Sequence, residues 1–331
     1  MKLVNLEILR AVAAGLVVIY HTLGGLILKG IDIGPMAFFY PLGSAGVDIF
    51  FVISGFVIYL GISKQRKSPH LFLKARFRRI IPAYWIATLL TVIFTFAYGA
   101  VAGIFGMENS LRPVSALWFI ESLFFASNFT GNGMPVVGQG WTLEYEMFFY
   151  LLVAAGLLFR LKLAVYLLPL TVLTSLVLFT DLSIMVVEFI LGMGLALIYT
   201  KFRIKTLLAW LFLALGIFLF GLTALVGPEM NPSRITWVLG SFFVVVGAVY
   251  LPERNSTFAF KLGAASYAVY LLHALTYPLV NFGFGKLFPV MNLIEVIACV
   301  LVSLSIAQVI GLIFESKIDK PLRTWLVSKG L

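Results

Sequence analysis

Ionisable side chains lie inside long apolar segments of this sequence, where a charged group costs at least about 3 kcal/mol to insert. In the first segment, Arg10 and His21 are 11 positions apart. In a helix this spacing places them about 20° apart on one face and about 16 Å apart along the axis. Ala14, Val17 and Val18 fill the stripe between them, a wall that a thin acyl chain can follow. Arg10 either snorkels to lipid headgroups or binds an anion, and His21 is either a base or a packing residue.

Two acidic residues fall at the same expected depth as His21. Asp48 lies about four residues outward of the midpoint of the second apolar segment, and Glu146 has a similar depth in the segment that begins at Trp141. We therefore expect His21, Asp48 and Glu146 to converge, with one of the acids orienting the histidine. The alternative for Asp48 is stabilisation near a helix N-terminus. Small residues around Asp48 should allow close approach of a helix or a ligand: Gly43, Ala45, Gly46 and Gly55.

A basic run precedes the third apolar segment. Arg76 and Arg79 are three positions apart, so they share a helix face and can grip phosphate groups bidentately. Lys74 and Arg78 in the same run are explained by contact with anionic lipid at the cytoplasmic surface.

One later segment carries a polar stripe. Ser266, Tyr270, His273 and Tyr277 follow one another at spacings of four, three and four, which places them on one helix face. His273 is nearly central in its segment. It is either a second functional base, the gate of a tunnel, or a structural histidine bonded to a tyrosine.

The elements that position these residues are apolar helices. Of 331 residues 61% are apolar and 11% charged, against roughly a quarter charged in a soluble domain. A water-soluble fold is therefore excluded. Runs long enough to cross a ~30 Å hydrocarbon core recur, and they lack the alternation of a β-barrel. We predict an all-α polytopic membrane protein, a single domain over 1–331, with about ten transmembrane helices at roughly 6–28, 42–61, 80–102, 141–159, 163–180, 182–199, 207–226, 235–251, 264–284 and 290–314.

One long connection, 103–140, contains an apolar stretch from Ser115 to Phe125 that is too short to span the membrane. It should be re-entrant or interfacial. The first segment is expected to be retained rather than cleaved as a signal peptide, because it exceeds a typical apolar signal region and contains Glu7 and Arg10.

Charge placement predicts that both termini are cytoplasmic. This orientation leaves four basic residues outside: Lys29, Arg112, Arg234 and Lys286. It places the following inside: Lys64, Arg66, Lys67, Lys74, Arg76, Arg78, Arg79, Arg160, Lys162, Lys201, Arg203, Lys205, Arg254, Lys261, Lys317, Lys320, Arg323 and Lys329. The net charge of +10 then follows from topology, and no nucleic-acid partner is expected.

Cysteine and histidine usage argues against a metal site. Cys299 is the single cysteine, so disulfides within the chain and thiolate clusters are excluded, and the chain has only three histidines. No metal or redox cofactor is expected.

Five blocks in order resemble the acyltransferase 3 family of membrane acyltransferases, most of all its exopolysaccharide O-acetyltransferases of the succinoglycan type. They are the Arg10 and His21 pair and the stretches from Gly46 to Phe56, Arg76 to Tyr84, Trp141 to Glu146 and Ser266 to His273. The resemblance implies a ten-helix enzyme of the bacterial inner membrane. Such an enzyme moves an acyl group, usually acetyl, from cytoplasmic acyl-CoA to a surface carbohydrate. It also implies functional roles for Arg10, His21, Arg76 and Arg79.

The resulting hypothesis assigns acyl-CoA phosphates to Arg10, Arg76 and Arg79. His21, oriented by Asp48 or Glu146, would be a general base on a sugar hydroxyl or a transient acyl carrier. The acceptor would be a surface polysaccharide or lipid-linked saccharide, in contact with membrane lipids, and the oligomeric state is left open. Two rival interpretations are a transporter with a proton relay, which would not consume acyl-CoA, and a membrane partner in a polysaccharide-assembly complex, which would tolerate loss of His21.

Overall fold

The computed structural model describes residues 3–64, 68–104, 115–131, 133–159, 161, 163–180, 183–226, 232–254 and 256–330. Five of the basic residues used to predict the orientation lie outside these ranges: Arg66, Lys67, Arg112, Arg160 and Lys162.

Helices dominate the described residues, and no strand occurs among them. The α-helices are α1 (Val4–Ile27), α2 (Phe39–Lys64), α3 (Pro69–Ile104), α4 (Ala116–Leu123), α5 (Trp141–Leu158), α6 (Ala164–Phe179), α7 (Val187–Lys201), α8 (Thr206–Val226), α9 (Pro232–Tyr250), α10 (Thr257–Leu287), α11 (Leu293–Phe314) and α12 (Lys320–Ser328). Short turns of 3-10 helix lie at Gly34–Phe38, Gly138–Gly140 and Ile184–Val186, and a π-helical turn at Glu315–Asp319 joins α11 to α12.

Eight helical segments among the described residues are long and apolar enough to cross a membrane, and α6 and α9 are shorter apolar helices. These elements coincide with the ten apolar segments read from the sequence, so the prediction of an all-α polytopic membrane protein is confirmed. The number of crossings and the cytoplasmic position of both termini stay predictions.

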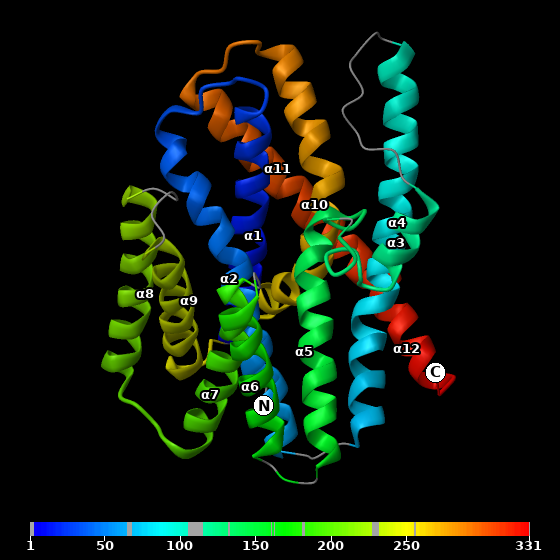
Figure 1. The fold of residues 1–331 in the computed structure, drawn as a ribbon. Helices are drawn as coiled ribbons and strands as arrows, with labels where there is room; N and C mark the ends of the chain where they lie inside the picture. Colours follow the sequence, from blue (N-terminus) through cyan, green and yellow to red (C-terminus); the bar gives the residue numbers. More distant parts are fainter. Residues whose placement is uncertain are drawn as a thin grey trace.

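Helix α1 occupies the centre of the bundle, packed along α2 on one side and α10 on the other (Figure 1). Helix α2 also packs on α7, α8 pairs with α9, and α10 packs against α11. The connections from α1 to α2 and from α10 to α11 lie at one end of the bundle, whereas the C-terminal ends of α2 and α7 lie at the other. The helix that carries Arg10 and His21 is therefore held on both sides.

Glycines set the close spacing of α2 against its neighbours. A Cβ atom added at Gly46 would overlap the carbonyl of Ala13 in α1, and one added at Gly55 would overlap the carbonyl of Phe189 in α7. Gly46 and Gly55 thus admit neighbouring helices, as predicted for small residues, rather than a ligand.

We expect Gly55→Ala to destabilise the bundle by about 1–3 kcal/mol, because the added methyl group forces α2 and α7 apart. Gly61→Ala is the matched control in the same helix, since no atom lies within 4 Å of its added Cβ. Thermal unfolding in detergent should show a lower midpoint for Gly55→Ala alone. Equal midpoints for the two variants would contradict the packing argument.

Candidate active site

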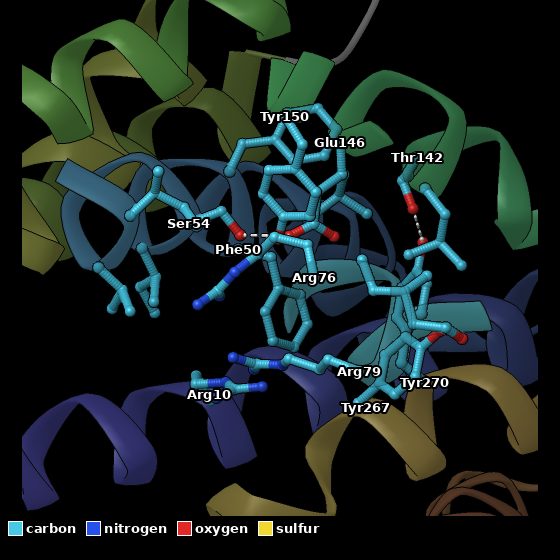
Figure 2. A pocket seen from close by; sticks show the side chains of 17 residues that line it. Arg10, Phe50, Ser54, Arg76, Arg79, Thr142, Glu146, Tyr150, Tyr267 and Tyr270 are labelled. Atoms are coloured by element: carbon cyan, nitrogen blue, oxygen red, sulfur yellow. Dashed lines mark hydrogen bonds between the residues drawn. The ribbon is translucent and has the colours of Figure 1, made fainter. Parts of the chain in front are cut away.

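A narrow cavity, called here the arginine cavity, lies between α1, α2, α3, α5 and α10 (Figure 2). Its volume is about 80 Å³, and Arg10, Arg76 and Arg79 line it together with Ser54 and Glu146. Figure 2 shows the guanidinium ends of the three arginines directed into one space beside Phe50. Arg76 and Arg79, which were predicted to lie on one helix face, thus line the same cavity.

The positive charges of this cavity are only partly compensated. Arg10 lies 3.5 Å from Glu7, but neither Arg76 nor Arg79 forms an ion pair within the described ranges. The Nε of Arg76 is buried without a hydrogen-bond partner. Because buried charges normally find a counter-charge, this set of donors fits an anionic ligand such as a phosphate.

Glu146 is the acid of the arginine cavity. Its carboxylate accepts hydrogen bonds from Ser54 Oγ at 2.9 Å and from the hydroxyl of Tyr150. The expected position beside His21 is wrong, because helix α5 does not start at the end of the bundle. The turn Gly138–Gly140 that precedes it already lies in the interior, where Gln139 donates to backbone carbonyls in the middle of α10. Glu146, nearly two turns further on, therefore lies deeper than the sequence suggested.

A second and wider cavity, of about 1350 Å³, contains His21 and is called here the histidine cavity. Its volume exceeds the ~300–1,000 Å³ of pockets for drug-sized ligands. Aromatic rings make up much of its wall: Tyr20, Tyr40, Phe94, Trp118, Trp141, Trp237, Tyr270, Tyr277 and Phe282. A cavity of this volume can hold a ligand built of several linked ring units.

His21 is paired with His273 of α10. His273 Nδ1 lies 2.7 Å from the carbonyl of Tyr270, so this nitrogen is the proton donor and Nε2 is an acceptor. That Nε2 lies 3.2 Å from His21 Nδ1, which is also 2.9 Å from the carbonyl of Val17. His21 Nδ1 therefore carries its proton, and His21 Nε2 has a free lone pair, the state that a general base or nucleophile requires.

Asp48 is not the partner of His21, which corrects the prediction from depth. The carboxylate of Asp48 is fully buried, 3.9 Å from Arg234 Nη1 of α9 and next to Glu188 of α7. The cause is rotation about the helix axis. Gly46 faces α1, and Asp48, two positions or about 200° further round, faces the opposite side.

The stripe of small residues between Arg10 and His21 lines no continuous passage. Ala14 and Val18 are buried against Val269 and Ala307, and Val17 alone of the three borders the histidine cavity. Ala14, Val17 and Val18 therefore do not form the wall for an acyl chain that the sequence suggested.

The two cavities meet at Val47 and Tyr270, which line both. The hydroxyl of Tyr270 donates to the carbonyl of Gln139 at 3.0 Å and lies 2.8 Å from Thr142 Oγ1. The arginines and the histidine pair thus lie on opposite sides of one layer of side chains, and we call this layer the Tyr270 divide.

Two buried acids have positions that the sequence analysis missed. Glu144 accepts the backbone N–H groups of Ser127 and Asn128 at 3.0 and 2.9 Å, which anchors the segment that follows α4 inside the bundle. This arrangement favours the re-entrant alternative for 115–125.

Glu188 could have been recognised from the sequence as a candidate site residue. It is an acid inside a predicted apolar segment, where the cost of inserting a charge demands a partner.

Comparison with known proteins identifies the class of enzyme. The family model described as an acyltransferase domain, acyltransferase 3, matches residues 3–312. The chain belongs to this acyltransferase family. It is therefore a multi-pass membrane O-acyltransferase, which argues against the transporter interpretation.

Two curated relatives support membership of the acyltransferase family. The exopolysaccharide production protein ExoZ of Rhizobium meliloti is 33% identical over 258 residues, 71% of this chain and 76% of that protein. The peptidoglycan O-acetyltransferase OatA of Listeria monocytogenes is 32% identical over 174 residues, 48% of this chain and 24% of that protein. No solved structure gives a significant match.

No group of three or more His, Cys, Asp or Glu residues suited to holding a metal ion occurs in the part of the chain that the structure describes.

We expect His273→Ala to lower kcat for acyl transfer by about tenfold, the value of one hydrogen bond that keeps His21 in its reactive tautomer. His273→Gln should retain more activity, because a side-chain carbonyl can accept from His21 Nδ1. Steady-state kinetics should show the loss in kcat with little change in donor KM.

His70→Ala is the control, since His70 is exposed at the start of α3 and borders neither cavity. A wild-type kcat for His273→Ala would rule out the positioning role of His273.

Proposed function

We propose that the enzyme transfers an acetyl group from acetyl-CoA to a hydroxyl of a surface polysaccharide, in the bacterial inner membrane. The arginine cavity binds the donor from the cytoplasm, and the histidine cavity binds the acceptor from the other side. The observation that carries this proposal is the location of unpaired arginines and of an unprotonated histidine nitrogen on the two sides of one thin divide.

The donor site is supported by charge and by shape. Acyl-CoA presents several phosphate groups and a slender, uncharged pantetheine arm. Arg10, Arg76 and Arg79 supply planar guanidinium groups that match phosphate oxygens. The narrow space beyond them, with apolar walls from Phe50 and Phe51, suits the arm and excludes the charged nucleotide.

The arm must pass the Tyr270 divide to bring its thioester to His21. Passage requires the ring of Tyr270 to move from its hydrogen bonds with Gln139 and Thr142. Each such bond has a net worth of about 1 kcal/mol, so donor binding can readily open the divide. Val47, the other residue common to both cavities, forms the apolar side of the opening.

His21 Nε2 then supplies the chemistry. Acting as a base, it takes the proton of the acceptor hydroxyl while the hydroxyl oxygen attacks the thioester carbonyl; the carbon–sulfur bond breaks and the departing thiolate receives the proton. Acting as a carrier, Nε2 attacks the thioester carbonyl, the carbon–sulfur bond breaks and the thiolate of CoA leaves. The acceptor hydroxyl then attacks the acetyl group on Nε2, the carbon–nitrogen bond breaks, and the hydroxyl proton passes to the thiolate. Both routes use the same lone pair, and both require the proton of His21 to stay at Nδ1, where the carbonyl of Val17 and His273 Nε2 are its acceptors.

A polysaccharide acceptor is supported by the two relatives, whose names refer to exopolysaccharide and to peptidoglycan O-acetylation. It is also supported by the width and the aromatic lining of the histidine cavity. Aromatic side chains offer rigid apolar faces beside polar tips, which suits the mixed surface of a sugar ring.

The decisive experiment is transfer of radiolabel from acetyl-CoA to polysaccharide in membranes that contain wild-type or His21→Ala protein. We expect a loss of at least about 100-fold in the variant, the usual contribution of a general base. An immunoblot of the membranes establishes equal insertion. Equal labelling by the two proteins would overturn the assignment of His21.

We expect Arg76→Gln and Arg79→Gln each to raise the KM for acetyl-CoA by about tenfold or more, because each removes a charged partner for phosphate. Arg78→Gln is the matched control in the same helix, since Arg78 does not line the cavity. Initial rates at varied donor concentration give the answer. A donor KM that is unchanged in the first two variants would refute the donor site.

A further inference from the structure

Basic residues on the outer side are rare in the predicted orientation, and those that the structure describes gather at one place. Lys29 and Arg234 line the histidine cavity. Lys286 and Lys29 both lie over the ring of Phe282, another lining residue, with ammonium-to-centroid distances of 5.8 and 5.9 Å. Because the topology rule disfavours cations on this side, their gathering around one cavity calls for a reason other than orientation.

Acidic side chains do not offset these cations inside the cavity. None of the described residues that line it is Asp or Glu. Two acids near the same end of the bundle serve the backbone instead: Asp32 accepts the N–H of Gly34 at 2.9 Å, and Glu295 forms a capping box with Asn292 at the start of α11. No described acid that lines the cavity therefore opposes Lys29, and the carboxylate near Arg234, that of Asp48, is fully buried and does not line the cavity.

Arg234 is held so that part of its guanidinium remains available. Nη1 lies 3.9 Å from the buried carboxylate of Asp48, and Nη2 contacts the sulfur of Met185 at 2.6 Å. A thioether is a weak acceptor, and the guanidinium has five N–H donors. The side chain of Arg234 is 38% exposed and lines the cavity, so part of it is accessible to a ligand there.

We propose that the acceptor carries a negatively charged group, a carboxylate or a phosphate, which Arg234 binds in the histidine cavity while Lys29 and Lys286 attract it at the mouth. The planar fork of a guanidinium matches the paired oxygens of either group. This inference rests on the proposed function only in taking the ligand of the cavity to be the acceptor.

The charged group has two possible sources. It is either an acidic sugar within the saccharide or the diphosphate that joins a saccharide to a lipid carrier. Both present oxygens of the same chemistry to Arg234, and they differ in whether the saccharide itself must be charged.

Binding to the purified full-length protein in detergent, measured by calorimetry without an acyl donor, tests the proposal. The probes are a glucuronate-containing tetrasaccharide, the same tetrasaccharide with its carboxylates reduced to alcohols, and a polyprenyl diphosphate. We expect one or both anionic probes to bind at least about tenfold more tightly than the reduced tetrasaccharide, since a hydrogen bond to a charged group is worth that much. Preference for the glucuronate probe assigns the acidic sugar, and preference for the diphosphate assigns the carrier.

Variants locate the binding group. Arg234→Gln should abolish the preference, and Arg234→Lys should retain part of it. Because Arg234→Gln also leaves Asp48 without its cation, a second test uses the Lys29→Gln/Lys286→Gln double variant, whose lysines form no ion pair with Asp48. This variant should show an independent loss of affinity that grows at low salt. Arg203→Gln is the control, because Arg203 stacks on Tyr199 outside the cavity.

Equal affinity for charged and neutral probes, no binding of either anionic probe, or a preference that survives Arg234→Gln would each overturn the proposal. Failure of the proposed function is a separate result. Anion-selective binding without label transfer from acetyl-CoA would reject the acetyl-transfer proposal and leave the anion site in place.

Discussion

The cost of a charge inside an apolar bundle governs where every functional group of this enzyme lies. Among the described residues, the ionisable groups of the candidate site have a partner or border a cavity. Asp48 lies 3.9 Å from Arg234 and Glu146 accepts two hydroxyl groups, whereas Arg76 and Arg79, which form no ion pair with any described residue, line a cavity. An unpaired charge in such surroundings would cost several kcal/mol. The proposed anionic ligands would supply counter-charges to the arginines that line the two cavities.

Close packing of α1 against α2 and α10 fixes the positions of the charged and polar residues that α1 carries. Gly46 lets α2 touch the backbone of α1, and Gly263 of α10 meets the carbonyl of Glu7 in the same way. With neighbours at backbone contact on both sides, a methyl group added at Gly46 or Gly263 would overlap the backbone of α1. Arg10 in one cavity and His21 in the other are consequently kept at a separation of about 16 Å along one rigid helix.

Depth along a helix could be predicted from this sequence better than rotation about it. The apolar segments, the shared face of Arg76 and Arg79 and the polar stripe of α10 all follow from spacing, which is a property of one helix. The partner of His21 depends on two helices, and depth alone favoured Asp48 over His273. The direction in which Asp48 points could have been predicted in principle. The glycine face of α2 had to pack on a neighbouring helix, and Asp48 lies on the side of α2 opposite Gly46. The start of α5 inside the bundle could not be predicted, since it depends on contacts of Gln139 with α10 that no local pattern encodes.

If the two cavities open to opposite sides of the membrane, as proposed, most of the transmembrane voltage falls across the Tyr270 divide. When two aqueous cavities enter a membrane protein from opposite sides, the transmembrane voltage falls mainly across the layer between them. Each elementary charge that crosses 100 mV gains or loses about 2.3 kcal/mol. In the proposed mode of donor binding, the thioester arm carries no net charge and would cross without electrical work, whereas phosphates held by Arg10, Arg76 and Arg79 would remain outside the field. A layer closed by Tyr270, Thr142 and Gln139 can thus pass an acyl group between compartments while the membrane keeps its ion gradients.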